Sequence, residues 1–309
     1  MQKIFAIIVT YNGLHWIDKC LKSLTGSTMP LSIIVIDNGS TDGTSEFVQQ
    51  HYSGVKFIQS AINLGFAKAN NIGVKKAYDA GADYVFLLNQ DAWVEKNSIE
   101  KLISTFDNFP DAGIVSPVHL NGKGTDLDFG FKSYLSQNNT ADFVSDMYFG
   151  NLKAVYETKF VNAAAWMLNR RCIEKVGGFD TSIFYHYGED DNYSQRVVFH
   201  GFKIYICSKA TVCHDREQRN GEKTKEFQDK ESEIEFRIYY GNVLIDDKIV
   251  DNKLLYLQSQ LTFTYLLLFK FKFEKFKKSR KRIKTEIELI NNIKQSRVLN
   301  KKGQLIWLD

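Results

Sequence analysis

Two short polar segments of the sequence carry side chains suited to binding a nucleotide. Thr10-Tyr11-Asn12-Gly13 follows one apolar run, and Asp37-Asn38-Gly39-Ser40-Thr41-Asp42-Gly43-Thr44 follows a second. The carboxylate of Asp37 can accept a hydrogen bond from a ribose hydroxyl or from a base N–H. The serine and threonine residues of the same segment could instead cap the helix that comes next. Nucleotide binding and helix capping therefore both stay open for this segment taken alone.

A third polar segment has features of an anion-binding loop. Asn63-Leu64-Gly65-Phe66-Ala67 precedes Asn70-Asn71 at the start of a helical pattern. Gly65 lets the backbone approach a ligand closely, and the N-terminus of the following helix favours negative charge. A phosphate group is the ligand that this combination predicts.

A fourth segment, Asn89-Gln90-Asp91, ends an apolar run and offers a carboxylate for a divalent metal ion. Mg²⁺ or Mn²⁺ is typically held by one or two carboxylates, with phosphate oxygens and water completing its coordination. The alternative is an aspartate that only stabilises a turn.

These segments need a scaffold that brings them together, and the order of apolar runs predicts one. Short β-branched runs alternate with helical patterns at Leu14–Leu24, Ala67–Tyr78 and Ile99–Phe106. The runs are Ile4–Val9, Ile33–Ile36, Val55–Ile58, Tyr84–Leu88 and the pair Ile114–Val115. Alternating strands and helices predict an α/β fold with a mostly parallel, Rossmann-like sheet flanked by helices. Ligands of such sheets bind at the carboxyl ends of the strands, where the polar segments lie.

The composition is that of a globular protein and excludes several classes. The 309 residues are 44% hydrophobic and 25% charged, and the four cysteines lack CxxC spacing, which argues against a structural zinc site or a disulfide framework. The apolar run Ile4–Val9 is too short for the core of a signal peptide. We therefore expect the catalytic part in the cytoplasm.

Taken together and in order, the polar segments resemble glycosyltransferase family 2, and its rhamnosyltransferase-like branch most closely. The similar segments are IIVTYNG, IIVIDNGSTDGT, NLGFAKANNIG and DYVFLLNQDAWV, followed by Gly177-Gly178-Phe179-Asp180, the stretch Tyr187 to Arg196, and His214. The resemblance covers about residues 3 to 220. It implies a GT-A fold over residues 1–235, with a nucleotide-sugar half at about 1–120 and an acceptor half at about 121–235. A helical, basic segment would then occupy residues 236–309.

The resemblance also assigns roles to individual residues. The positions expected to meet the nucleotide-sugar are Thr10, Asn12, Asp37, Asn38, Ser40, Asn63, Gly65, Asn70 and Asn89. Asp91 matches the last acidic residue of the family's DxD-type metal motif, and His214 matches a histidine that often completes the metal site. Asn89 stands where many members have aspartate, which leaves fewer carboxylates for Mg²⁺ or Mn²⁺. The alternative for His214 is a structural histidine with satisfied hydrogen bonds.

Three consecutive acids, Glu189, Asp190 and Asp191, match the family's ED pair and its neighbour. The resemblance implies that this cluster supplies the general base that takes a proton from the acceptor hydroxyl. We expect Asp190 to be the base and Asp191 to be the second candidate. Arg196, on the same predicted helix, would hold the carboxylates in place. The alternative is that the acids only stabilise the N-terminus of the helix.

The C-terminal part of the chain concentrates positive charge. Residues 270–284 hold nine lysine or arginine residues and one acidic residue, a net charge of +8, whereas the whole chain carries +4. The uncharged stretch Leu254–Phe269 precedes them and is shorter than the ~20 apolar residues that span a bilayer. An interfacial helix with a polybasic anchor on an anionic membrane is one interpretation. A helix packed on the catalytic domain, followed by a solvated helix, is the other.

The expected activity is transfer of a sugar from a UDP- or dTDP-linked donor to a hydroxyl of a growing polysaccharide or lipid-linked glycan. We do not expect a nucleic-acid partner, because the chain outside the basic run is acidic. A nicotinamide-dependent oxidoreductase is disfavoured by the lack of GxGxxG after the first strand. A non-catalytic nucleotide-sugar or carbohydrate-binding subunit is disfavoured by the retained acids.

Overall fold

The first ninety residues build the parallel half of the sheet. The computed structural model describes residues 2–216, 225–269 and 272–308. Its first four strands are β1 (Ile4–Thr10), β2 (Ser32–Asp37), β3 (Lys56–Gln59) and β4 (Tyr84–Asn89). They pair in parallel in the order β3-β2-β1-β4. The strands expected from the β-branched runs are therefore confirmed.

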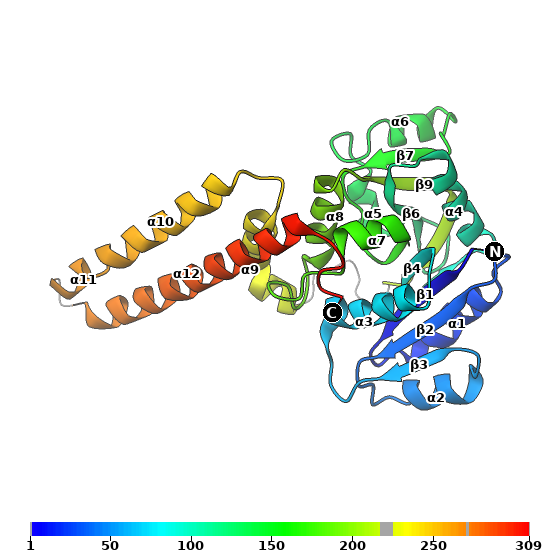
Figure 1. Cartoon of the computed structure of the whole chain (residues 1–309), viewed down its shortest axis with the longest axis horizontal. Helices are drawn as coiled ribbons and strands as arrows, with labels where there is room; N and C mark the ends of the chain where they lie inside the picture. Colours follow the sequence, from blue (N-terminus) through cyan, green and yellow to red (C-terminus); the bar gives the residue numbers. More distant parts are fainter. Residues whose placement is uncertain (1, 217–224, 270–271, 309) are drawn as a thin grey trace.

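Helices cover both faces of this sheet, as Figure 1 shows. The covering helices are α1 (Leu14–Thr25), α2 (Thr44–His51), α3 (Gly65–Asp79), α4 (Ser98–Asn108), α7 (Arg170–Val176) and α8 (Glu189–Phe199). Alternate residues of β1 point to opposite faces. Ile7 packs in the core under α3, α7 and α8, whereas Ala6 and Ile8 pack in the core under α1, α2 and α4. The expected α/β class with flanking helices is thus observed.

The second half of the sheet mixes strand directions. Its strands are β5 (Ala92–Val94), β6 (Ala112–Asn121), β7 (Val155–Thr158), β8 (Ala165–Asn169) and β9 (Lys203–His214). β8 lies antiparallel between β4 and β6, and β9 runs parallel to β6. Two short helices, α5 (Phe129–Tyr134) and α6 (Phe143–Tyr148), occupy the irregular part of the chain after β6. β9 extends to His214, where β5 pairs with it.

The C-terminal part forms a helical hairpin that projects from the catalytic domain (Figure 1). Its elements are α9 (Lys225–Gly241), α10 (Asp247–Phe263), α11 (Leu266–Phe269) and α12 (Phe273–Lys302). α10 packs against α12 through Val250, Leu257, Ile283 and Ile290, in a core separate from the two sheet cores. Residue 235, the expected end of the catalytic domain, lies inside α9.

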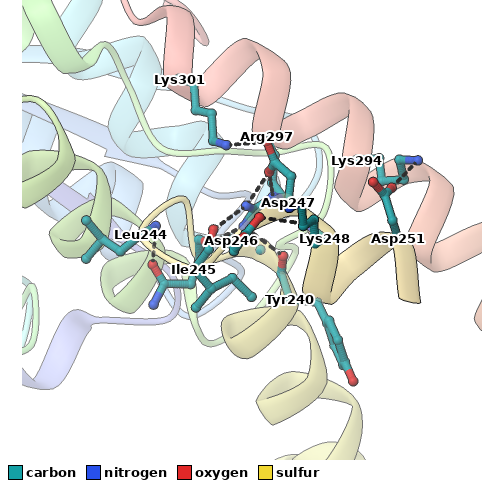
Figure 2. A network of polar contacts seen from close by, with 12 residues as sticks. Tyr240, Leu244, Ile245, Asp246, Asp247, Lys248, Asp251, Lys294, Arg297 and Lys301 are labelled. Carbon is teal, nitrogen blue, oxygen red and sulfur yellow. Dashed lines mark hydrogen bonds and ion pairs between the residues drawn. The ribbon is translucent and has the colours of Figure 1, made fainter. Parts of the chain in front are cut away.

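The base of the hairpin is fixed by a buried arginine (Figure 2). The side chain of Arg297 is 2% exposed and donates to the carboxylate of Asp247 and to the carbonyl oxygens of Asn242 and Ile245. Such pairing offsets the cost of removing the guanidinium from water. Lys301 also binds Asp247, with 2.7 Å between Nζ and Oδ2.

The chain after α12 returns to the catalytic domain. The amide of Gly178 donates to the carbonyl of Ile306 at 2.8 Å, and Leu308 is buried in the core beneath α3 and α7. Asn300 and Ser296 of α12 both donate to the buried carboxylate of Asp180. The C-terminal end of the hairpin is therefore attached to the sheet domain.

The expected packing of the C-terminal helix on the catalytic domain does not match the hairpin, and the interfacial interpretation stays a prediction. α10 packs mainly on α12 rather than on the sheet domain, and its exposed face carries Leu255 and Tyr256. Within the described residues, no helix is both long and apolar enough to cross a membrane. Lys270, the first residue of the expected basic run, and Phe271 lie outside the described residues.

Candidate active site

The loops after β1 and β4 are joined by Gln90, a residue to which we assigned no role from the sequence. Thr10 Oγ1 donates to Gln90 Oε1 at 2.6 Å, and the amide of Tyr11 donates to the same oxygen at 2.9 Å. Gln90 Nε2 donates back to the carbonyl of Tyr11 at 3.2 Å. A Cβ on Gly13 would lie 2.1 Å from Gln90 Oε1, so this contact requires glycine there. The contact follows from the pairing of β1 with β4.

Asn12 joins the first loop to the second. Its backbone has a φ of 48°, a conformation that asparagine adopts more readily than most residues. The amide of Asn12 donates to Ser40 Oγ at 2.9 Å, and its side-chain Oδ1 accepts from the amide of Thr41 at 2.9 Å. Asn12 and Ser40, both expected at the nucleotide, therefore contact each other directly.

Asp37 ends β2 as expected, and its carboxylate is engaged by its own loop. It is fully buried and accepts from the amides of Gly39 and Ser40 and from the hydroxyls of Ser40 and Ser45. These bonds fix the loop after β2 and use the acceptor positions that a ribose hydroxyl would need. In this structure Asp37 shapes the loop, and a direct contact with a nucleotide stays a prediction.

Asn38 joins the second loop to the third. Its Nδ2 donates to the carbonyl of Gly65, and its Oδ1 accepts from the amide of Leu64, both at 3.3 Å. Gly65 has a φ of 79°, and a Cβ there would lie 2.8 Å from the carbonyl oxygen of Tyr185. Gly65 is thus required by the turn and by close packing against a neighbouring loop.

Asn63 and Asn70, the other two residues expected near the nucleotide-sugar in this part of the chain, have different surroundings. Asn63 Oδ1 accepts from the amide of Gly65 at 2.9 Å, and Asn63 lines a cavity of about 370 Å³ together with Lys68 and Tyr185. Asn70 is buried, and its Nδ2 donates to the carbonyl of Phe66 in its own helix at 3.0 Å. Asn63 therefore lies beside open space, whereas Asn70 contributes to the helix.

Asp91 and His214 meet at the end of the sheet, although 122 residues separate them in sequence. The β5–β9 pairing sets Ala92 opposite His214, and this places Asp91 Oδ1 3.3 Å from His214 Nε2. Both side chains are buried, and Nε2 has no hydrogen-bond partner among the described residues. An imidazole nitrogen left unsatisfied beside a carboxylate suits a divalent metal ion. In the described part of the chain no group of three or more histidine, cysteine or carboxylate side chains is arranged to hold a metal ion.

Asn89, where many family members have aspartate, ends β4 next to this pair. Its amide donates to the carbonyl of Ala164 at 2.9 Å, and its own carbonyl accepts from the thiol of Cys20 at 3.6 Å. The backbone of Asn89 is therefore held by β8 and α1.

Two residues that the sequence did not reveal lie behind His214. Asp128 Oδ2 is 3.7 Å from His214 Nδ1, and Arg216 Nε donates to the same nitrogen at 3.2 Å. Because arginine can only donate, this bond places the ring proton on Nε2. A metal ion at Nε2 requires the proton at Nδ1 instead, where Asp128 is the nearby acceptor. Metal binding by His214 and its contact with Arg216 therefore exclude each other.

The three acids open α8, and their environments differ. Burial and the negative charge of Asp190 raise the pKa of Glu189 to about 8, and Glu189 Oε2 has no hydrogen-bond partner among the described residues. Burial and the charge of Asp190 also raise the pKa of Asp191 to about 8.

Burial raises the pKa of Asp190 as well, but its ionised form has more support. The amides of Ala163 and Asp191 donate to its carboxylate at 3.4 Å and 3.1 Å, and the charge of Arg216 lowers its pKa. Among the three acids, Asp190 is therefore the one whose ionised form the surroundings favour most.

Arg196 does not hold these carboxylates, contrary to our expectation. It is fully buried, and its guanidinium donates to the carbonyl of Gly178 at 2.6 Å and to that of Val176. Burial lowers the pKa of Arg196 to about 10. The residue instead fixes the Gly177-Gly178 turn to α8.

Hydrogen-bonded polar loops at the strand ends, a buried Asp–His pair and carboxylates with raised pKa suit an enzyme that transfers a group from a nucleotide. The sequence pattern of Glycosyl transferase family 2 matches residues 5–177, and the chain belongs to this family. It is a nucleotide-sugar-dependent glycosyltransferase.

Curated relatives agree with this assignment. N-acetylglucosaminyl-diphospho-decaprenol L-rhamnosyltransferase of Mycobacterium tuberculosis is 26% identical over 247 residues, which cover 70% of this chain and 76% of the relative. The dTDP-rhamnosyl transferase RfbF of Shigella flexneri is 24% identical over 218 residues, 69% of each chain. The resemblance to rhamnosyltransferases is thereby confirmed. The oxidoreductase alternative is excluded by the family, and no relative supports the non-catalytic alternative.

Solved structures show the GT-A fold. S. aureus TarS 1-349 in complex with UDP-GlcNAc matches with a TM-score of 0.56 at 16% identity, over 80% of this chain and 68% of that one. GalNAc-T7 with UDP, GalNAc and Mn²⁺ matches with a TM-score of 0.55 at 17% identity, over 70% of this chain. This chain spans 44% of the GalNAc-T7 chain.

Proposed function

We propose that the enzyme transfers a rhamnosyl or hexosyl group from a UDP- or dTDP-linked donor to a hydroxyl of a lipid-linked or growing glycan, with inversion. The rhamnosyltransferase names of the two relatives support the sugar and the lipid-linked acceptor. Two features carry the proposal. The loops at the strand ends are hydrogen-bonded to one another, and the ionised form of Asp190 is stabilised by a backbone amide.

Asp91 and His214 would hold Mg²⁺ or Mn²⁺ once Arg216 leaves Nδ1 of His214 and Asp128 accepts the proton there. The position of the buried Nε2 beside Asp91 supports this role. A bound ion would neutralise the negative charge that develops on the leaving diphosphate. With two protein ligands only, the other coordination positions would belong to diphosphate oxygens and water.

Asp190 acts as the general base. It accepts the proton of the acceptor hydroxyl while the acceptor oxygen forms a bond to the anomeric carbon and the bond to the diphosphate breaks. Glu189, with its raised pKa, keeps its proton at neutral pH and leaves the negative charge of the cluster on its neighbour. Asp191 remains the second candidate for the base.

The reaction takes place in the cytoplasm, at the inner face of the membrane where a lipid-linked acceptor lies. An anionic membrane surface is the partner that the basic C-terminal segment would bind.

A panel of UDP- and dTDP-sugars tests the activity by donor hydrolysis and by transfer to a polyprenyl-diphosphate-linked sugar. We expect turnover with Mg²⁺ or Mn²⁺ and loss of turnover in excess chelator. His214→Ala should abolish Mn²⁺-dependent binding of the nucleoside diphosphate in calorimetry, a readout independent of turnover. Full activity in chelator would show that the metal assignment is wrong.

A further inference from the structure

The distal end of the hairpin exposes large apolar side chains. Phe263 is 60% exposed, Tyr265 47%, Leu266 54% and Phe273 54%. We call these four residues the hairpin tip. They lie at the junction of α10 with α11 and at the start of α12, at the end of the hairpin farthest from the catalytic domain (Figure 1). Apolar side chains gathered at one exposed point indicate a binding surface.

Exposed basic residues lie beside the hairpin tip, at the start of α12 and along its first turns. They are Lys272, Lys275, Lys277, Lys278, Lys281, Arg282 and Lys284. Between residues 263 and 285 the sequence has one acidic residue, Glu274. Apolar and aromatic side chains beside a dense positive charge match the interface of an anionic bilayer, where the former enter the headgroup region and the latter bind lipid phosphates.

Side chains of the hairpin pack against the tip and directly behind it. The guanidinium of Arg280 lies 4.8 Å from the ring centre of Tyr265, and the rings of Tyr265 and Phe276 are 5.8 Å apart. Behind them, Leu257 and Ile283 pack in the core shared by α10 and α12. The 30 residues of α12 span about 45 Å at 1.5 Å per residue, so the hairpin tip lies far from the strand ends that carry the active site.

We propose that the hairpin tip docks on an anionic lipid bilayer, with Phe263 and Leu266 in the interface and the lysines of α12 on the lipid headgroups. The inference rests on the proposed function, which names an anionic membrane as a partner, and it adds which side chains of the hairpin enter the bilayer interface. A second copy of this chain is the less favourable occupant, because two hairpin tips would bring like charges together.

Vesicle co-sedimentation of the full chain tests the docking. The probes are vesicles of phosphatidylcholine alone and of phosphatidylcholine with 30% phosphatidylglycerol. We expect binding to the anionic vesicles and at least a tenfold loss of the bound fraction when salt rises from 0.05 to 0.5 M, where screening is strong. Phe263→Ser with Leu266→Ser should weaken binding about tenfold, and so should Lys277→Gln with Lys278→Gln, Lys281→Gln and Arg282→Gln.

A matched control removes two exposed aromatic residues elsewhere. Tyr148→Ser with Phe149→Ser, on and directly after α6, should leave vesicle binding unchanged. Donor hydrolysis in solution should be the same in all these variants, so a failure of docking is distinguishable from a failure of the proposed chemistry. Binding that is equal on both vesicles, or unchanged in both hairpin variants, would overturn the proposal. A concentration-dependent dimer in sedimentation velocity, abolished by the tip variant in the absence of vesicle binding, would assign the tip to a second copy.

Discussion

The loops at the ends of β1 and β2 and the acid cluster at the start of α8 satisfy their polar groups in opposite ways. In the loops, Thr10 bonds to Gln90, Asn12 to Ser40 and Asp37 to its own loop. In the acid cluster, Glu189 has an oxygen without a hydrogen-bond partner among the described residues, and burial raises the pKa of the acids.

This difference in hydrogen bonding suits the loops to ligand binding and the acid cluster to proton transfer. A loop whose hydrogen bonds are already made presents a fixed shape and loses little entropy when a ligand binds. A carboxylate that is buried and incompletely paired has a higher pKa and accepts a proton more readily. We therefore expect substitutions in the loops to change stability and donor affinity, and substitutions in the acid cluster to change turnover and pH dependence.

The largest expected effect is that of Asp190→Asn. Removal of the base should lower turnover at least about 10²-fold, with the melting temperature and the donor affinity preserved. Because burial raises the pKa of Asp190, the wild-type turnover should fall with decreasing pH at a higher pH than an ordinary aspartate would give. Steady-state kinetics across pH measures both.

Asp191→Asn is the matched control for the base. If this variant loses turnover while Asp190→Asn does not, the base is Asp191 and the mechanism stands. Normal turnover in both variants would place the base outside the cluster. A loss of stability with turnover intact would mean that the acids serve the helix N-terminus alone.

Asp37→Ala should mainly affect binding and stability. It leaves the amides and hydroxyls that bind Asp37 without an acceptor, at a cost of about 1–3 kcal/mol in the free energy of unfolding. The loop then loses its shape, and calorimetry should show the nucleoside diphosphate binding about tenfold more weakly. Glu46→Ala, at an exposed residue in the first turn of α2, is the control and should leave the affinity unchanged. Unchanged affinity in folded Asp37→Ala would remove this residue from the site.

The smallest expected effect is that of Glu189→Gln on thermal stability. An unfolded glutamate has a pKa near ~4.3, whereas burial raises it to about 8 in the folded protein. The buried neutral form therefore stabilises the fold at low pH, and this contribution is lost as pH rises through the folded pKa. Glutamine keeps a neutral side chain, so the variant should melt at least ~2–4 °C above wild type at pH 8.5 and close to it at pH 5.

Glu46→Gln is the control, because Glu46 also lies in the first turn of a helix but is exposed. A difference in melting temperature that is independent of pH, or equal at both positions, would contradict the raised pKa of Glu189.

The sequence predicted the strands of the parallel half and the polar residues at their ends. It did not predict the side-chain contacts that surround those residues. β-branched runs such as Ile33–Ile36 stand out because both faces of the strand are buried, and Asp37 and Asp91 follow such runs directly. Asp128 and Arg216 could not be found this way, because their contact with His214 depends on pairing between distant strands. A basic residue two positions after His214 was the available signal.

The packing of the hairpin could not be predicted from the sequence either. The apolar positions of α10 and α12 were visible in the sequence, but the choice between packing on the sheet and packing on each other depends on the whole fold. The position of the Arg196 side chain was equally unpredictable. Helical spacing placed Arg196 near the acids, but its long side chain carries the guanidinium to the Gly177-Gly178 turn.

Gly178 gives the hairpin a mechanical connection to the acid cluster. Its amide is held by Ile306, in the segment that leaves α12, and its carbonyl is held by Arg196 of α8. A sideways load on the distal end of the hairpin acts on a lever about 36 Å long at 1.5 Å per residue, from Phe273 to the fulcrum at the Arg297 contacts. Gly178 is thus bonded through its amide to the segment that follows the lever, and through its carbonyl to the helix that bears Asp190.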